Sequence, residues 1–191
     1  MDRRDFFKFS ANKAKQVAVK GADSRVRKRA AHWIRPPFAL DELEFLLACT
    51  RCSACSEACP HHVIFNLPSR LGVEVVGTPA MDLLNTACQL CDDWPCVMAC
   101  EPRALKREAD EASLPRLALA EIDTATCLPY NGPECGACKD SCPVDGAMRW
   151  QMEKPMIVTE LCVGCSLCRE ACIVEPKAIK LHSLYEEQPS A

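Results

Sequence analysis

Apolar residues recur at short intervals along the chain and predict small elements. After Asp41, residues Leu43, Leu46 and Leu47 fall on one face of a short helix, and Glu44 stands three residues beyond Asp41, as in a capping box. No stretch approaches the roughly 18 consecutive apolar residues that a membrane-spanning helix needs. We therefore expect a chain of short elements without a transmembrane segment.

Three segments have the pattern of strands. Alternating apolar positions at 147–152, a turn at Glu153-Lys154-Pro155 and the apolar run at 156–158 predict a hairpin. A further strand is expected at 73–76, and residues 117–122 form an apolar segment. Short helices and short strands together predict an α+β fold.

The N-terminal segment differs in charge from the rest of the chain. Residues 1–35 contain 11 basic and three acidic residues, a net charge of +8, whereas residues 36–191 contain 12 basic and 23 acidic residues, a net charge of −11. The run Arg3-Arg4-Asp5-Phe6-Phe7-Lys8 is similar to a twin-arginine export signal, but charged residues follow where such a signal has an apolar region.

A basic, weakly amphipathic helix is expected in this segment instead, and Pro36-Pro37 ends it. Its apolar positions are Phe6, Phe7, Phe9, Ala14, Val17 and Ala18. We predict a partly helical arm over residues 1–37, which could make a peripheral membrane contact. It lacks the interleaved aromatic residues and the motifs of nucleic-acid binding, so no nucleic-acid partner is expected.

All sixteen cysteines fall into four groups of four. The groups are Cys49, Cys52, Cys55, Cys59; Cys88, Cys91, Cys96, Cys100; Cys127, Cys135, Cys138, Cys142; and Cys162, Cys165, Cys168, Cys172. Three of the groups end in the spacing C-x2-C-x3-C. Thiols this close together converge on one centre, which disfavours disulfides between distant segments.

The spacing of the cysteines also favours iron–sulfur clusters over zinc sites. Zinc sites use two well-separated C-x2-C pairs, whereas here three thiols lie close together and a fourth follows three residues later. That run is typical of bacterial ferredoxins, in which three cysteines bind one cluster and the fourth binds its neighbour. We therefore predict four [4Fe-4S] clusters, with all sixteen cysteines as iron ligands.

Exchange of the fourth cysteine gives specific ligand sets if neighbouring groups pair. The sets are Cys49, Cys52, Cys55, Cys100; Cys88, Cys91, Cys96, Cys59; Cys127, Cys135, Cys138, Cys172; and Cys162, Cys165, Cys168, Cys142. This pairing predicts two tandem ferredoxin-like two-cluster domains at residues 38–110 and 111–185, followed by a tail at 186–191. A nested arrangement, with the first group paired to the fourth and the second to the third, remains open.

A few residues near the cysteines invite a role. Gly136 and Gly164 are expected to let backbone amides approach the clusters. Trp94 and Tyr130 lie inside cysteine loops, where shielding from solvent is expected. His61-His62 is expected at the surface, because every quartet is complete without it. No nucleophile and base pair, phosphate-binding loop or dinucleotide motif is present, so an electron carrier is predicted and not an enzyme.

Five pieces of the sequence match one group of proteins. They are Arg35-Pro36-Pro37, Cys49-Thr50-Arg51-Cys52-Ser53-Ala54-Cys55, Cys88-Gln89-Leu90-Cys91-Asp92-Asp93-Trp94-Pro95-Cys96, the Cys127-x7-Cys135 spacing and Cys172-Ile173-Val174-Glu175-Pro176-Lys177-Ala178-Ile179-Lys180. With these pieces the chain resembles the NapF/NapG/MauM group of ferredoxin-type proteins over about residues 33–182. The resemblance implies an accessory protein of periplasmic nitrate reductase or methylamine dehydrogenase systems.

Location separates the members of this group, and with it the function that the resemblance implies. A NapF-like protein stays in the cytoplasm and helps to mature or reduce the molybdenum-containing nitrate reductase catalytic subunit. A NapG-like or MauM-like protein is exported and serves a membrane quinol dehydrogenase. The charged residues after Arg3-Arg4 favour the cytoplasmic role, and the central motifs are closer to NapG. A third hypothesis is an assembly chaperone whose arm recognises the partner.

Overall fold

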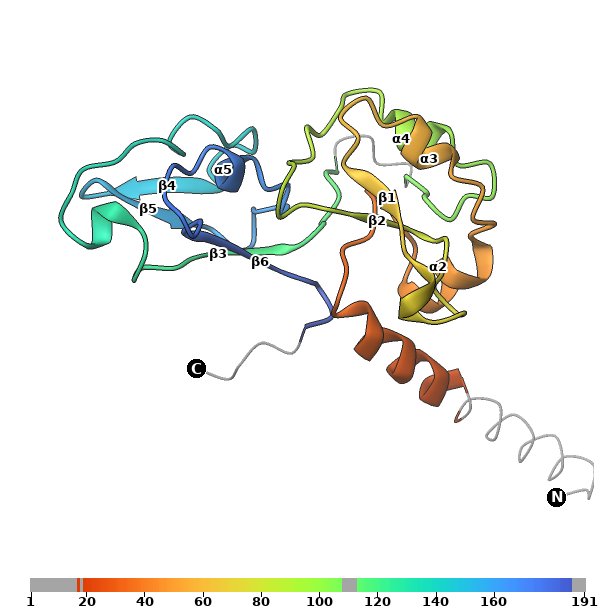
Figure 1. Cartoon of the computed structure of the whole chain (residues 1–191). Coiled ribbons are helices and arrows are strands. Elements are labelled where there is room, and N and C mark those ends of the chain that lie inside the picture. The colour runs from red at the N-terminus through yellow and green to blue at the C-terminus, as the bar shows by residue number, and fades with distance from the viewer. Residues whose placement is uncertain (1–16, 18, 108–112, 187–191) are drawn as a thin grey trace, which may run out of the picture.

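The computed structural model describes residues 17, 19–107 and 113–186 and has a mixed helix and strand fold. Two groups of short elements lie next to each other (Figure 1). The first half, residues 31–107, contains α2 Glu42–Ala48, α3 Ala54–Glu57, β1 Ile64–Asn66, η1 Ser69–Leu71, β2 Pro79–Met81 and α4 Pro95–Met98. The second half, residues 113–186, contains β3 Leu119–Ile122, η2 Leu128–Tyr130, β4 Met148–Gln151, β5 Lys154–Ile157, α5 Leu167–Glu170 and β6 Ile179–His182. The predicted boundary at 110/111 lies outside the described residues.

The two halves pair their strands in the same order. In the second half, β4 and β5 form an inner antiparallel pair, and β3 pairs antiparallel with β6 from the other end of the half. In the first half, β1 and β2 form the inner pair. The outer pair is there reduced to one bridge between Ala39 and Leu105, flanked by a bond from Leu40 N to Ala104 O at 3.0 Å. Each half therefore brings its own first and last segments together.

Two strand predictions need correction. Residues 73–76 form turns, and the strand begins later, at Pro79. The predicted hairpin is present, but its turn lies at Met152 and Glu153, whose φ angles are 47° and 62°. Pro155, placed in the turn by sequence, is buried in β5 opposite Trp150. A two-residue turn with both φ angles positive matches the twist of paired strands, so it overrides the turn preference of proline.

Helix α2 begins where the sequence predicts, but without a capping box. Asp41 precedes the helix and makes no side-chain cap. Its carboxylate accepts from Arg27 Nη2 at 3.3 Å, and the Glu42 backbone N–H donates to the Tyr185 hydroxyl, also at 3.3 Å. The unpaired amide at the helix start is thus satisfied by a residue far along the chain.

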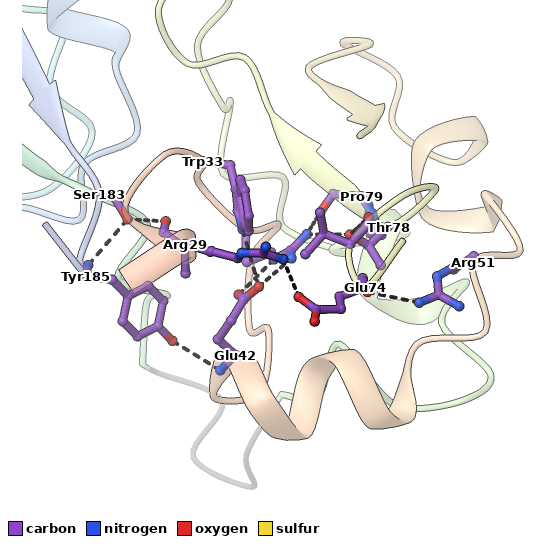
Figure 2. A network of polar contacts seen from close by, with 12 residues as sticks. Arg29, Trp33, Glu42, Arg51, Glu74, Thr78, Pro79, Ser183 and Tyr185 are labelled. Carbon is purple, nitrogen blue, oxygen red and sulfur yellow. Dashed lines mark hydrogen bonds and ion pairs between the residues drawn. The ribbon is translucent and has the colours of Figure 1, made fainter. Parts of the chain in front are cut away.

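A buried ion pair lies beneath α2. Arg35 donates to both carboxylate oxygens of Glu42, at 2.9 and 2.5 Å, and its Nη1 donates to Thr78 Oγ1 at 3.0 Å. The guanidinium lies 4.6 Å from the Phe45 ring centroid, and Trp33 Nε1 also donates to Glu42 (Figure 2). Two buried charges are tolerated here because every nitrogen of the Arg35 guanidinium has a hydrogen-bond partner.

A helix at residues 17 and 19–30, the N-terminal helix, leads into the first half and contacts both halves. Arg29 pairs with Glu74, and Ser183 Oγ donates to the Ala30 carbonyl at 2.9 Å (Figure 2). The Arg27 guanidinium lies 5.6 Å from the Tyr185 ring centroid. The twin-arginine-like run and most of the predicted amphipathic helix lie outside the described residues. Across the described part of the chain, no helix is both long and apolar enough to cross a bilayer.

The main core contains cysteines as well as apolar side chains. Phe45, Leu83 and Trp94 are the bulky members, and Cys88 and Cys165 are buried beside them. This cluster also takes in Leu117, Ala118 and Val163, so it extends across both halves. The cysteines are therefore part of the interior that holds the chain together.

Candidate metal centres

The cysteines border three small cavities in quartets. One cavity is lined by Cys49, Cys52, Cys55 and Cys100, a second by Cys59, Cys88, Cys91 and Cys96, and a third by Cys142, Cys162, Cys165 and Cys168. Their volumes, open mouths included, are about 330, 330 and 350 Å³. In each, three cysteines come from one group and the fourth comes from the neighbouring group. Cavities of similar size, each with four cysteines in its lining, suit the same kind of occupant.

The remaining four cysteines also converge. Burial raises the pKa of Cys138 to about 11, and the thiolates of Cys172, Cys127 and Cys135 add to this rise in pKa. The pKa of Cys127 is raised first by burial and then by Cys172 and Cys135. These four groupings are the ones that pairing of neighbouring groups predicts, and not those of a nested arrangement. Their role as iron ligands stays a prediction.

A repeated backbone conformation shapes three of the cysteine loops. Arg51, Leu90 and Gly164 each stand two residues after the first cysteine of a group, with φ angles of 59°, 49° and 71°. The backbone N–H of each donates to the sulfur of that first cysteine. At Arg51 and Leu90, which are not glycine, this φ costs roughly 1–2 kcal/mol of backbone strain. In return, the backbone amide of each residue points at sulfur.

The same conformation recurs before the short helices. Ser53, Trp94 and Ser166 precede α3, α4 and α5 with φ angles of 66°, 45° and 77°. Two of these turns are closed by backbone bonds, from Ser56 N–H to the Ser53 carbonyl at 3.0 Å and from Val97 N–H to the Trp94 carbonyl at 2.9 Å. The same two amides lower the pKa of Cys55 and Cys96, against the larger rise in pKa from burial. Hydrogen bonds to sulfur help to set the potential of iron–sulfur centres. The sequence gives little sign of this pattern, because only one of the six positions is glycine.

Burial makes the free thiolates unfavourable. It raises the pKa of Cys96 and Cys168 to about 12, with repulsion between neighbouring thiolates adding to the rise in pKa. The Arg35 guanidinium opposes the rise in the pKa of Cys49, in which burial is the largest cause. Desolvated thiolates that face one another need a positively charged centre between them to stay deprotonated, and a metal supplies it.

All sixteen cysteines are free thiols in the structure, so none forms a disulfide. Cys52 is the exposed member, and the others are buried or half-buried. Within residues 17, 19–107 and 113–186, no three His, Cys, Asp or Glu side chains are placed to hold a single metal ion. The donor set at each of the three cavities is four sulfurs, which fits a [4Fe-4S] cluster.

The other residues singled out by sequence have varied roles. Trp94 is buried, lines the second cavity and packs edge-on against Phe38 at 5.0 Å between ring centroids, as expected of a shield. Tyr130 instead donates to the Pro155 carbonyl at 2.9 Å and lines none of the three cavities. His61-His62 is exposed, as predicted.

The two glycines differ in what surrounds them. A Cβ on Gly164 would lie 2.3 Å from the Ala118 carbonyl oxygen, whereas one on Gly136 would meet nothing within 4 Å. Close packing against the backbone of Ala118, the residue before β3, is therefore a second requirement at Gly164, besides its bond to Cys162. No comparable requirement applies at Gly136.

Comparison with known proteins places these cysteines in a family context. No protein-family model and no solved structure matches the chain. The chain is 34% identical to the methylamine utilization ferredoxin-type protein MauM of Methylophilus methylotrophus over 163 residues, which are 80% of this chain and 72% of that protein. It is 30% identical to the ferredoxin-type protein NapF of Escherichia coli over 151 residues, 77% of this chain and 84% of that protein.

A third relative is longer than the region it shares with this chain. The ferredoxin-type protein NapG of Haemophilus influenzae is 35% identical over 162 residues, which are 78% of this chain and 58% of that protein. The likeness to all three relatives extends over most of the chain. The chain belongs to the NapG, MauM and NapF family of ferredoxin-type proteins.

Proposed function

We propose that the protein carries electrons through four [4Fe-4S] clusters and has no catalytic activity of its own. The observation that carries the proposal is the exchange of cysteines between neighbouring groups around three cavities of similar size. The ligands would be Cys49, Cys52, Cys55, Cys100; Cys59, Cys88, Cys91, Cys96; Cys127, Cys135, Cys138, Cys172; and Cys142, Cys162, Cys165, Cys168. The shared order of strand pairing supports two tandem ferredoxin-like domains.

Iron–sulfur clusters supply one-electron transfer, and the protein sets its conditions. Backbone amides of the cysteine loops donate to the sulfurs, as Arg51 does to Cys49 and Leu90 to Cys88. Trp94 excludes water from one cavity. The acidic residues of 36–191 suit a partner with a basic docking surface, because opposite charges speed association.

The partner in this proposal is an oxidoreductase, a molybdenum-containing nitrate reductase catalytic subunit, which the protein reduces or helps to mature in the cytoplasm. The family names support a role in nitrate reductase or methylamine systems. The second candidate is an exported or membrane-docked subunit of a quinol dehydrogenase complex, favoured by the likeness to NapG and MauM. Cell fractionation separates them: a periplasmic or membrane pool that disappears in the Arg3→Lys, Arg4→Lys variant would support the second.

Metal analysis of anaerobically purified protein tests the clusters. We expect about 16 iron and about 16 sulfide per chain, because each cubane holds four of each. The Cys100→Ser variant should lose about four iron, and so should Cys172→Ser, because each removes one ligand from one set. The control His62→Ala changes an exposed residue that lines none of the three cavities, and it should keep all the iron. Stoichiometric zinc, or about four iron in the wild type, would contradict the proposal.

A further inference from the structure

Helix α5 of the second half reaches into the first half. Ser166 Oγ donates to the Leu83 carbonyl at 2.5 Å, and Arg169 Nε donates to the Leu84 carbonyl at 3.1 Å. The Glu170 carboxylate accepts from the backbone N–H of Ala87 at 3.1 Å. Three side chains from one helical turn therefore hold the segment that leads directly into Cys88.

This contact joins two cysteines that belong to different quartets. The backbone N–H of Cys88 donates to the carbonyl of Cys165 at 2.9 Å. Cys88 lines the second cavity, and Cys165 lines the third. Both cysteines are buried in the core cluster that the two halves share. The second and third cavities thus have linings that touch across the boundary between the halves.

The equivalent turn of the first group makes no such contact. Ser53 occupies the position of Ser166, directly after the second cysteine, and has nearly the same φ, 66° against 77°. Its hydroxyl accepts from Asn66 within the first half, whereas Ser166 is 3% exposed and bonds the other half. A cysteine loop of this type therefore forms without the cross-half bonds, so these bonds serve something besides metal ligation.

We propose that Ser166 and Glu170 are positioning residues that fix the second and third cavities side by side, so that the two halves act as one electron-transfer unit and not as two independent carriers. The proposal rests on the proposed function. The exchange it serves moves one electron: one half is oxidised, the other is reduced, and no bond forms or breaks.

Electron paramagnetic resonance of the fully reduced protein tests the proposal, because magnetic interaction between neighbouring centres broadens and splits their signals. The Ser166→Ala, Glu170→Ala variant should keep about 16 iron and lose the part of the splitting that arises between the halves. Arg169 stays unchanged, because it also donates to the Ile179 carbonyl within the second half. The matched control is Ser53→Ala, Glu57→Ala, which changes the same positions of the first group and should leave the spectrum unaltered.

The single Ser166→Ala variant tests the same idea with less risk to folding than the double variant. It should weaken the splitting while its iron content stays complete. Ser53→Ala controls for the backbone conformation, since both serines have a positive φ. An unchanged spectrum in an iron-complete Ser166→Ala variant would overturn the inference, as would equal changes in the Ser53→Ala variant. A wild type with fewer than four centres would contradict the proposed function, whereas four centres without magnetic interaction between the halves would contradict only this inference.

Discussion

The two halves bring their first and last segments together through different interactions. The second half closes with β3 and β6, which pair over four residues from Leu119 to Ile122. The first half has only the Ala39–Leu105 bridge at that place, and it contains the buried Arg35–Glu42 pair and contacts the N-terminal helix through Arg29 and Glu74. The first half thus combines a shorter strand pairing with a buried ion pair whose charges all have partners. A variant that breaks each interaction in turn measures its contribution to the stability of the fold.

The largest expected effect follows from breaking the buried pair of the first half. Glu42→Gln leaves the Arg35 guanidinium buried without a carboxylate, and we expect a loss of about 3–5 kcal/mol of stability. The matched control is Glu44→Gln, an exposed position in the same first turn of α2. Anaerobic thermal unfolding would measure both. Equal losses in the two variants would mean that only the charge near the helix start matters.

A smaller loss of stability is expected where the backbone before β3 packs on the cysteine loop that contains Gly164. Gly164→Ala would place a Cβ against the Ala118 carbonyl at a positive φ, so we expect about 2–5 kcal/mol from the clash and the backbone strain together. Gly136→Ala has open space and should change stability by less than about 1 kcal/mol. Denaturant unfolding would measure the difference, and similar values for the two variants would contradict the packing argument.

The smallest effect is expected from an ion pair that links β3 and β6. Lys180 Nζ lies 2.8 Å from Asp123 Oδ2, and its hydrogen bond is the first cause that lowers the pKa of Asp123. A lowered pKa in the folded state means that the stabilisation is complete above the unfolded pKa, about 3.9, and is lost as the pH falls through the folded pKa. Asp123→Asn should therefore lower the unfolding temperature at neutral pH and match the wild type in strong acid. A difference that persists in acid would mean that the pair contributes nothing through charge.

The short-range features could be predicted from the sequence, and the long-range ones could not. Cysteine spacing favoured the pairing of neighbouring groups and left a nested arrangement open, and alternation predicted the hairpin at 147–158. The Arg35–Glu42 pair and the bond from Ser166 to Leu83 depend on how distant segments pack, and no local pattern reports that. The positive φ at Arg51 and Leu90 could not be predicted from the sequence, because neither residue type favours it.

Residues 183–185 have a consequence for the order in which the protein can be completed. The Tyr185 hydroxyl satisfies the start of α2, and Ser183 binds the end of the N-terminal helix. A chain emerging from the ribosome makes the first half early, but these contacts wait until all the cysteine loops have been synthesised. The N-terminal helix therefore completes its contacts only after both halves have left the ribosome. A fully docked N-terminal helix thus indicates that the last cysteine group has already been synthesised.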